Sequence, residues 1–135
     1  MRARWLVVPA LIVTALGVHL GSAPGSEDES SGTLVVTIEG FRNATGHARV
    51  ALFNRDAGFP DEESAAYRTA VTVIQNGHTE VRFDNLPLSD YAVSMYHDEN
   101  DDDTLNKGRF GIPKEGYGVS NNVVHALRAP KFDEA

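Results

Sequence analysis

The sequence predicts an all-β fold, an antiparallel β-sandwich with one long, acidic, glycine-rich loop. Two observations lead to this prediction: apolar residues alternate with a period of two along several short segments, and polar turns separate these segments. A chain of 135 residues holds one domain, which we expect to span residues 33–135. Because the chain contains no cysteine, its stability must come from core packing rather than from disulfides.

The residues before this domain predict an export signal. Two arginines precede an apolar stretch, Trp5–Leu20, and the small residues at 21–23 supply a cleavage site. We therefore assign residues 1–25 to a signal peptide and the polar stretch 26–32 to a spacer, which predicts an exported protein, periplasmic or extracellular. The alternative is a retained membrane anchor, for which the apolar span is short.

The charge of the chain restricts its partners. The sequence has 12 basic and 19 acidic residues, and removal of a signal peptide with two arginines leaves ten bases against 19 acids, a net charge of −9. Nucleic acids and anionic membrane surfaces attract basic proteins. We therefore expect neither nucleic-acid binding nor membrane insertion after signal cleavage, whereas the charge suits cations.

The domain contains six candidate strands. Asn76-Gly77 lies between two of them and predicts a two-residue hairpin, because both central residues of that turn need positive φ. One short helix is expected within residues 59–68, where a proline precedes three acidic residues. The predicted strands are residues 33–40, 47–54, 70–75, 79–86, 90–97 and 122–128. Six side chains in the apolar phase should point inward together: Val36, Val50, Leu52, Phe83, Val93 and Met95.

An acidic run follows the fifth strand, with five carboxylates in the six positions from Asp98 to Asp103. Such a run repels itself when bare, but a hard cation turns it into a set of ligands. Oxygen-bearing residues occupy alternate positions, as in the 12-residue calcium loop. The predicted calcium ligands are Asp98, Asn100, Asp102, Thr104 (through its backbone carbonyl) and Asn106.

Two positions of this loop depart from the calcium pattern. Asp103 stands at the sixth position, where glycine is expected, and Arg109 stands at the closing position, where it cannot coordinate. Glu115 is a carboxylate further along that could take the closing role. The sequence thus predicts a weak calcium site and no other cofactor. The alternative is a solvated acidic turn whose charge keeps the protein soluble.

The rest of the long connection mixes glycines with apolar residues. This mixture predicts an ordered loop that is pinned to the sandwich by Phe110, Ile112, Tyr117 and Val119. An exposed aromatic patch that stacks on sugars or on a peptide is the alternative to buried anchors; its members would be Phe59, Tyr96, Phe110 and Tyr117.

No residue is predicted to be catalytic. Asp98 could form an acid–base pair with His97 or with Glu115, but no serine or threonine lies in a nucleophile-activating context. A zinc site would need a third ligand near His97 and His125, and the sequence offers none at workable spacing. We therefore expect a protein that is not an enzyme.

The block from Tyr91 to Asn122, "YAVSMYHDENDDDTLNKGRFGIPKEGYGVSNN", together with "GHARVALFN", "GFP" and "APKFDEA", resembles domain of unknown function 2141. That family consists of small exported bacterial proteins without an established activity. The resemblance covers about Gly32 to Ala135 and implies a transthyretin-like or immunoglobulin-like sandwich. It also implies glycine where this chain has Asp101 and Asp103. Members of the family commonly continue into a further strand after "FDEA", and without that strand we expect an open edge beside residues 123–127.

These observations together predict a secreted, non-enzymatic module. It would bind a divalent cation in its acidic loop and act as an envelope or extracellular accessory or interaction domain. The alternative is a small-molecule or glycan-binding domain with a pocket floored by "FGIPKEGYG", residues 110–118, and a hydrolase is the third candidate. The expected partners are a divalent cation, an envelope protein or glycan, and a second copy that associates weakly through the edge strand.

Overall fold

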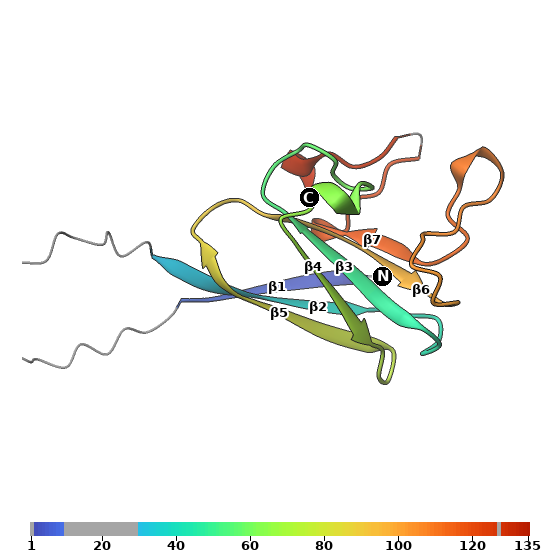
Figure 1. Cartoon of the computed structure of the whole chain (residues 1–135), viewed down its shortest axis with the longest axis horizontal. Coiled ribbons are helices and arrows are strands. Elements are labelled where there is room, and N and C mark those ends of the chain that lie inside the picture. Colours follow the sequence, from blue (N-terminus) through green and yellow to red (C-terminus); the bar gives the residue numbers. More distant parts are fainter. Residues whose placement is uncertain (1, 10–29, 127) are drawn as a thin grey trace, which may run out of the picture.

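The computed structural model describes residues 2–9, 30–126 and 128–135, with side chains described from residue 30 onward. The strands form two antiparallel sheets around one core (Figure 1). Short 3-10 helices are the only helical elements in these ranges. One sheet has the order β1 (Arg2–Pro9), β2 (Ser31–Glu39) and β5 (His78–Pro87), and the other has the order β4 (Arg68–Val73), β3 (His47–Phe53), β6 (Ala92–Asp98) and β7 (Tyr117–Val119).

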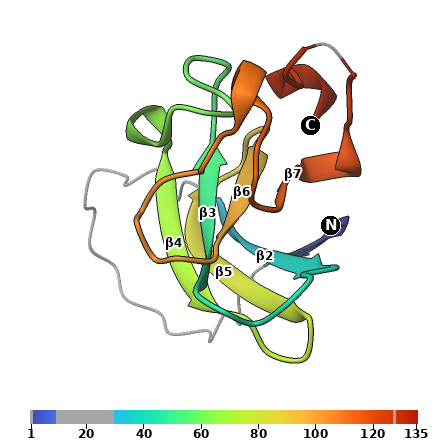
Figure 2. The ribbon, with the colours of Figure 1, turned by 90° about the vertical axis from the view of Figure 1, so that its right-hand side faces the viewer.

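Apolar side chains from both sheets meet in the core, as the alternation predicts. Figure 2 shows the two sheets with β3 and β6 in one and β2 and β5 in the other. All six residues that we expected to point inward are buried, which confirms the assigned strand phases: Val36, Val50, Leu52, Phe83, Val93 and Met95.

The hairpin between β4 and β5 forms at the predicted place. Asn76 and Gly77 have φ values of 52° and 76°, and the flanking Gln75 and His78 exchange backbone hydrogen bonds of 2.9 and 3.0 Å. The carbonyl of Gly77 also accepts the N–H of Gly40 at 3.2 Å. The hairpin tip therefore also holds the end of β2.

The sixth predicted strand, residues 122–128, is wrong at its described positions, since residues 122–126 and 128 lie outside any strand. The structure instead forms the short strand β7 at Tyr117–Val119, which pairs with β6. Extension stops there because the 3-10 helix η3 (Ser120–Asn122) follows, with Asn121 at φ 57°. The hydroxyl of Ser120 then accepts the N–H of Val93 at 2.9 Å, in the place of a further backbone partner.

The helix expected within residues 59–68 is reduced to one turn, η1 (Glu63–Ala65). The chain is already extended at Ala66 (φ −64°, ψ 144°), and the N–H of Tyr67 bonds to the carbonyl of Leu52 at 2.8 Å. The approach to β4 therefore leaves too few residues for a longer helix.

The first residues of the chain form a strand. β1 pairs with β2 without interruption from Arg2 opposite Glu39 to Pro9 opposite Gly32. Residues 10–29, with the predicted cleavage site and most of the spacer, lie outside the described part, so the signal peptide stays a prediction. The first strand of the predicted domain, β2, begins at Ser31, two residues before the predicted boundary. In the described part, no helix is both long and apolar enough for a membrane span.

We expect Phe83→Ala to lower the free energy of unfolding by about 3–5 kcal/mol, because the ring is buried between the sheets and its removal leaves a cavity. Urea unfolding measures this loss. Leu88→Ala is the control: its side chain is 68% exposed, and its loss should stay below about 0.5 kcal/mol. Equal small losses in both variants would contradict the assignment of Phe83 to the core.

Candidate functional site

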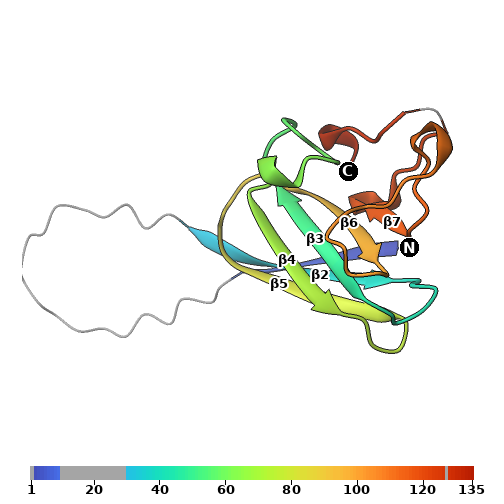
Figure 3. The ribbon, with the colours of Figure 1, turned by 45° about the vertical axis from the view of Figure 1, so that its right-hand side comes forward.

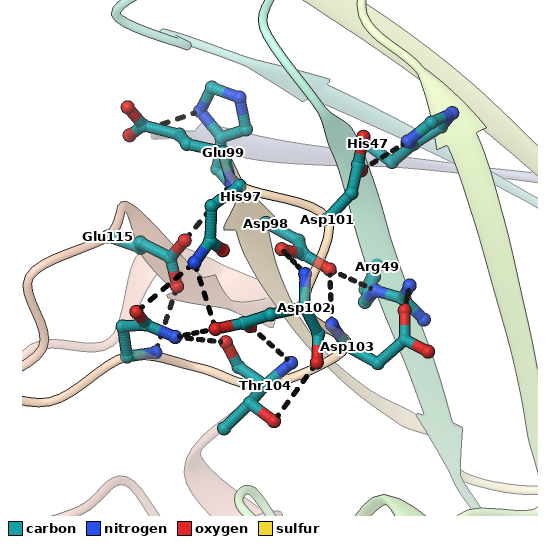
Figure 4. A network of polar contacts seen from close by, with 12 residues as sticks. His47, Arg49, His97, Asp98, Glu99, Asp101, Asp102, Asp103, Thr104 and Glu115 are labelled. Atoms are coloured by element: carbon teal, nitrogen blue, oxygen red, sulfur yellow. Dashed lines mark hydrogen bonds and ion pairs between the residues drawn. The ribbon is translucent and has the colours of Figure 1, made fainter.

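The acidic run lies at the end of β6, and its first carboxylate is completely buried. Asp98 is 0% exposed, and its Oδ2 accepts hydrogen bonds from Arg49 Nε at 2.6 Å and from the N–H of Asp103 at 3.0 Å (Figure 4). Its Oδ1 accepts the N–H of Asp102 at 3.1 Å. These bonds offset the cost of burying the charge. Asp98 therefore folds the run back over itself.

Arg49 comes from the outward face of β3, where the alternation of that strand predicts it. Its neighbour across the sheet is Tyr96 on β6, two residues before Asp98. The hydrogen bond to Asp98 raises the pKa of Arg49 above its ordinary value. The guanidinium therefore stays charged and serves as the fixed counter-ion of the buried carboxylate.

Most of the acidic run is paired with basic side chains of the protein itself. Basic side chains from β3 and from the connection before it reach four of the five carboxylates between positions 98 and 103. The two arginines among them reduce the self-repulsion that a bare run would have. The ion pairs are Arg42 with Glu99, His47 with Asp101, and Arg49 with both Asp98 and Asp103.

Asp102 is the exception, because it forms no ion pair with any basic side chain that the structure describes. Its Oδ2 accepts the amide N–H groups of Asn106 at 2.8 Å and Asn100 at 2.9 Å, and its Oδ1 accepts the N–H of Thr104 at 3.0 Å (Figure 4). The amides of Asn106 and Asn100 lower the pKa of Asp102. The amide of Asn106 also donates to the Thr104 carbonyl at 3.0 Å.

Four of the five predicted calcium ligands are thus brought together, and the fifth is engaged elsewhere. The oxygens of Asp102 and Thr104 converge on the amide of Asn106, and Asn100 lies beside them. Asp98 is held by Arg49 and by two backbone N–H groups. Its role is to shape the loop around Asp102.

Glu115 closes the loop, although through hydrogen bonds. Its buried carboxylate accepts the N–H of Glu99 at 3.0 Å and the N–H of Asn106 at 2.9 Å, so that it joins the two ends of the run. Asp103 has φ 62°, which is the left-handed conformation that glycine supplies at this position of a calcium loop. The two departures from the pattern are therefore accommodated in the backbone.

The two histidines considered for zinc lie at different places: His97 Nδ1 is 3.7 Å from Glu99 Oε1 of the acidic run, whereas His125 lies away from the run. His97 is buried, and its Nε2 is 2.6 Å from the carbonyl oxygen of Thr45, whereas His125 Nε2 is 3.1 Å from Glu134 Oε2. In the part of the chain that is described, His, Asp and Glu side chains form no group of three placed to hold a metal ion. A cation beside Asp102 would therefore rest on one carboxylate and on uncharged oxygens.

A cleft of about 1000 Å³ lies next to the loop, on the outer face of the four-stranded sheet. Its walls include the loop from Asp103 to Pro113 and parts of the segment 123–130. These two segments lie at one end of the molecule (Figure 3). Arg49 and Tyr96 contribute polar groups from the sheet. Burial raises the pKa of Tyr96 to about 12, so its hydroxyl is protonated and can donate a hydrogen bond.

Three of the four predicted loop anchors are exposed. Only Val119 is buried; Ile112 is exposed, Phe110 is 98% exposed and Tyr117 is 51% exposed. The loop is held by polar interactions at its base instead of by these apolar anchors. One of them is the hydrogen bond from the N–H of Lys114 to the Asn106 carbonyl at 2.8 Å. The exposed apolar side chains line the cleft.

The aromatic patch divides in the same way. Phe59 packs edge-to-face against Phe53 and Phe132, with ring centroids 5.3 and 6.1 Å apart, and so has a structural role. Tyr96, Phe110 and Tyr117 line the cleft. Of the predicted pocket floor, residues 110–113 and 117–118 contribute to the lining, whereas residues 114–116 do not.

Sequence reasoning missed the three basic residues that organise the loop. Arg42, His47 and Arg49 lie about fifty positions before their acidic partners. The outward phase of Arg49 in its strand is the one signal that could have pointed to it. Its partner follows only from the pairing of β3 with β6, which sets His47 opposite Asp98.

Comparison with known proteins identifies the family. The model of the family described as "Uncharacterized protein conserved in bacteria (DUF2141)" matches residues 36–135, and the chain belongs to this family. Searches of curated proteins and of solved structures gave no match. The family match confirms the resemblance to domain of unknown function 2141 and supplies no activity. The function must therefore be argued from the loop and the cleft.

We expect Arg49→Met to lower the free energy of unfolding by about 3 kcal/mol, because it leaves the Asp98 carboxylate buried without its counter-ion. Adding Asp98→Asn should recover part of this loss, which a double-mutant cycle measures. Arg82→Met removes the exposed pair with Asp84 and should cost less than about 1 kcal/mol. Similar losses for Arg49→Met and Arg82→Met would contradict the structural role of the buried pair.

Proposed function

We propose that this family member is an exported, non-enzymatic binding module whose acidic loop takes a weakly held calcium ion beside Asp102. The observation that carries the proposal is the state of the run 98–103. Four of its carboxylates pair with basic side chains, whereas Asp102 has no basic partner in the described structure and accepts hydrogen bonds from side-chain amides instead. One carboxylate is thus left for a cation from solution.

The residues around Asp102 fit a calcium ion chemically. A half-turn of the amides of Asn100 and Asn106 would present oxygen where nitrogen now faces Asp102. Together with the Thr104 carbonyl, these groups would supply uncharged oxygen ligands beside one carboxylate. Calcium accepts six to eight oxygen ligands in flexible geometry, with water completing the set. Magnesium requires a stricter octahedron and retains its water, so the loop favours calcium.

The anchors of the loop support weak and local binding. Asp98 and Glu115 hold the backbone through four N–H groups without any cation. Binding would therefore order the Asp102 side of the loop rather than fold it. With one free carboxylate and no bidentate closing glutamate, we expect a dissociation constant of about 10⁻⁴–10⁻³ M, as in extracellular calcium modules. The predicted signal peptide supports a compartment where such calcium concentrations occur.

Two serine hydroxyls beside β6 support a non-enzymatic role, because each forms a hydrogen bond within the fold. Ser94 Oγ donates to the Pro60 carbonyl at 2.8 Å, and Ser120 Oγ accepts the N–H of Val93 at 2.9 Å. Both groups are used to fix loops against β6. A hydrolase therefore remains the third candidate.

Calcium should stabilise the wild-type protein by about 2.7 kcal/mol when its free concentration is about 100 times the dissociation constant. Asp102→Asn should abolish this stabilisation, because it removes the unpaired carboxylate and keeps the shape of the side chain. Asp101→Asn is the matched control, since that carboxylate lies in the same run but pairs with His47. Thermal melts in calcium, magnesium and EDTA measure the effect. Identical melts in calcium and EDTA would reject the proposal.

A second candidate function uses the adjacent cleft. Phe110 and Tyr117 expose their rings to it, while Arg49 and Tyr96 offer hydrogen-bonding groups from the sheet. We propose a glycan or a small molecule with an apolar ring face as the ligand, because exposed apolar surface with a few fixed polar groups is typical of ligand sites. Asp103–Leu105 belong to the same lining, so a calcium ion beside Asp102 would also stiffen the wall of the cleft.

Phe110→Ser should weaken a glycan bound in the cleft by about tenfold, since it removes a stacking surface of roughly 1.4 kcal/mol. A glycan array identifies candidate ligands, and calorimetry measures their affinity. Leu88→Ser is the matched control: it also removes an exposed apolar side chain, at a position outside the cleft lining. Equal affinities for wild type and Phe110→Ser would exclude the cleft as the glycan site.

A further inference from the structure

Among the described residues, one edge of β2 is covered only by β1, and β1 lies in the segment that we propose is removed on export. β1 pairs with β2 along its whole length, and β1 also approaches β7 and η3 at the border of the other sheet. Cleavage after about residue 17 would take β1 away. The N–H and C=O groups of β2 that face β1 would then have no partner, and unpaired edges of this kind accept another strand.

We infer that, in the exported and cleaved protein, β2 pairs antiparallel with β2 of a second copy and so forms a two-fold symmetric dimer. This inference rests on the proposed export and signal cleavage, and it is independent of the calcium site. It also moves the expected self-association away from residues 123–127, of which the described residues 123–126 form no strand.

β2 lacks the sequence features that keep an edge strand from pairing with another chain. Natural edge strands are guarded by lysine, by proline, by charged side chains or by shortness. β2 is nine residues long, its sequence is SGTLVVTIE, and its single charged residue, Glu39, is the last. Two of the other edges are guarded: β7 has three residues, and β5 exposes Glu80, Arg82 and Asp84. The fourth edge, β4, has six residues and exposes Val71 and Val73, so it is the competing edge. The edge beside β1 offers the longer strand, nine residues against six.

The pattern of β2 also selects a register and a second copy as the occupant. Leu34, Val36 and Ile38 face the core, and the residues between them face outward. Residues directly opposite each other in an antiparallel pair point to the same side of the sheet. Only registers with a residue on the two-fold axis therefore match core face to core face.

An axis at Val35, the middle residue of β2, pairs the whole strand with its copy. Leu34 then lies opposite Val36 of the second copy, and each Glu39 lies opposite Ser31. The two Glu39 side chains are at opposite ends of the pairing, so like charges do not meet. The three-stranded sheet would lose β1 and continue across the axis into the second copy.

The absence of native cysteine allows a direct test by single-cysteine variants. The full precursor is expressed in a bacterial host, the exported product is purified, and mass spectrometry establishes its N-terminus. Val35→Cys places two thiols across the axis, within the distance that a disulfide bridges. Val71→Cys is the matched control, because Val71 lies on the edge strand β4 of the other sheet and is 53% exposed.

The inference predicts that oxidation converts most of the cleaved Val35→Cys protein into a disulfide-linked dimer and leaves Val71→Cys monomeric. The cleaved wild type should double its mass with rising concentration in sedimentation, which keeps the test valid if a variant misfolds. The uncleaved precursor should stay monomeric, since β1 covers the edge.

Three results would overturn the inference. The cleaved wild type could remain monomeric at every concentration, with Val35→Cys no more cross-linked than Val71→Cys. The edge could instead bind a strand of another protein while no dimer forms. The exported product could retain residues 2–9, in which case the proposed cleavage fails as well. The calcium response of Asp102→Asn is measured separately and distinguishes that failure from a failure of the cation site.

Discussion

The ion pair of Arg49 with the buried Asp98 is the interaction on which the acidic loop after β6 depends. A carboxylate without solvent needs a fixed counter-ion, and β3 supplies one beside β6. The Asp98 carboxylate also accepts hydrogen bonds from the N–H groups of Asp102 and Asp103, and these bonds fix the turn of the loop. The connection before β3 packs on the same residue: a Cβ at Gly46 would lie 1.9 Å from the Asp98 carbonyl oxygen, and Gly46 has φ 68°. Loop, turn and strand are thus fitted around one residue.

The acidic run separates into a structural part and an available part. Asp101 and Asp103 replace the glycines that the family resemblance implies, and both adopt positive φ, 54° and 62°. Asp101 pairs with His47 and Asp103 pairs with Arg49, so each added carboxylate has a basic side chain beside it. What reaches solvent without a counter-ion is the group around Asp102. The composition of the run therefore overstates the number of carboxylates that are open to a cation, and the calcium ion that we propose lies beside the one that is left, Asp102.

The strands and the core could be read from the sequence because period-two alternation is a local property. The phase of β5 and the Asn76-Gly77 turn follow from adjacent residues alone. Other features depend on pairing between distant strands. The partners of Asp98 and Glu99 follow from the register of β3 on β6, and the segment 122–128 alternates like a strand although η3 has already turned the chain. The exposure of Phe110 likewise depends on the conformation of the loop, which Glu115 fixes through its hydrogen bonds to the N–H groups of Glu99 and Asn106. No local sequence pattern predicts these bonds.

The fluorescent side chains of the chain, one tryptophan and four tyrosines, divide between the N-terminal segment and the domain. The only tryptophan, Trp5, lies on β1, and the domain beyond it contains four tyrosines. Two of these, Tyr96 and Tyr117, stand opposite each other on β6 and β7 and line the cleft. Tryptophan emission therefore belongs to the N-terminal segment alone. In a chain without that segment, ultraviolet fluorescence comes from tyrosine, and half of the emitting rings border the cleft. The protein carries separate optical labels for its N-terminal segment and for its cleft.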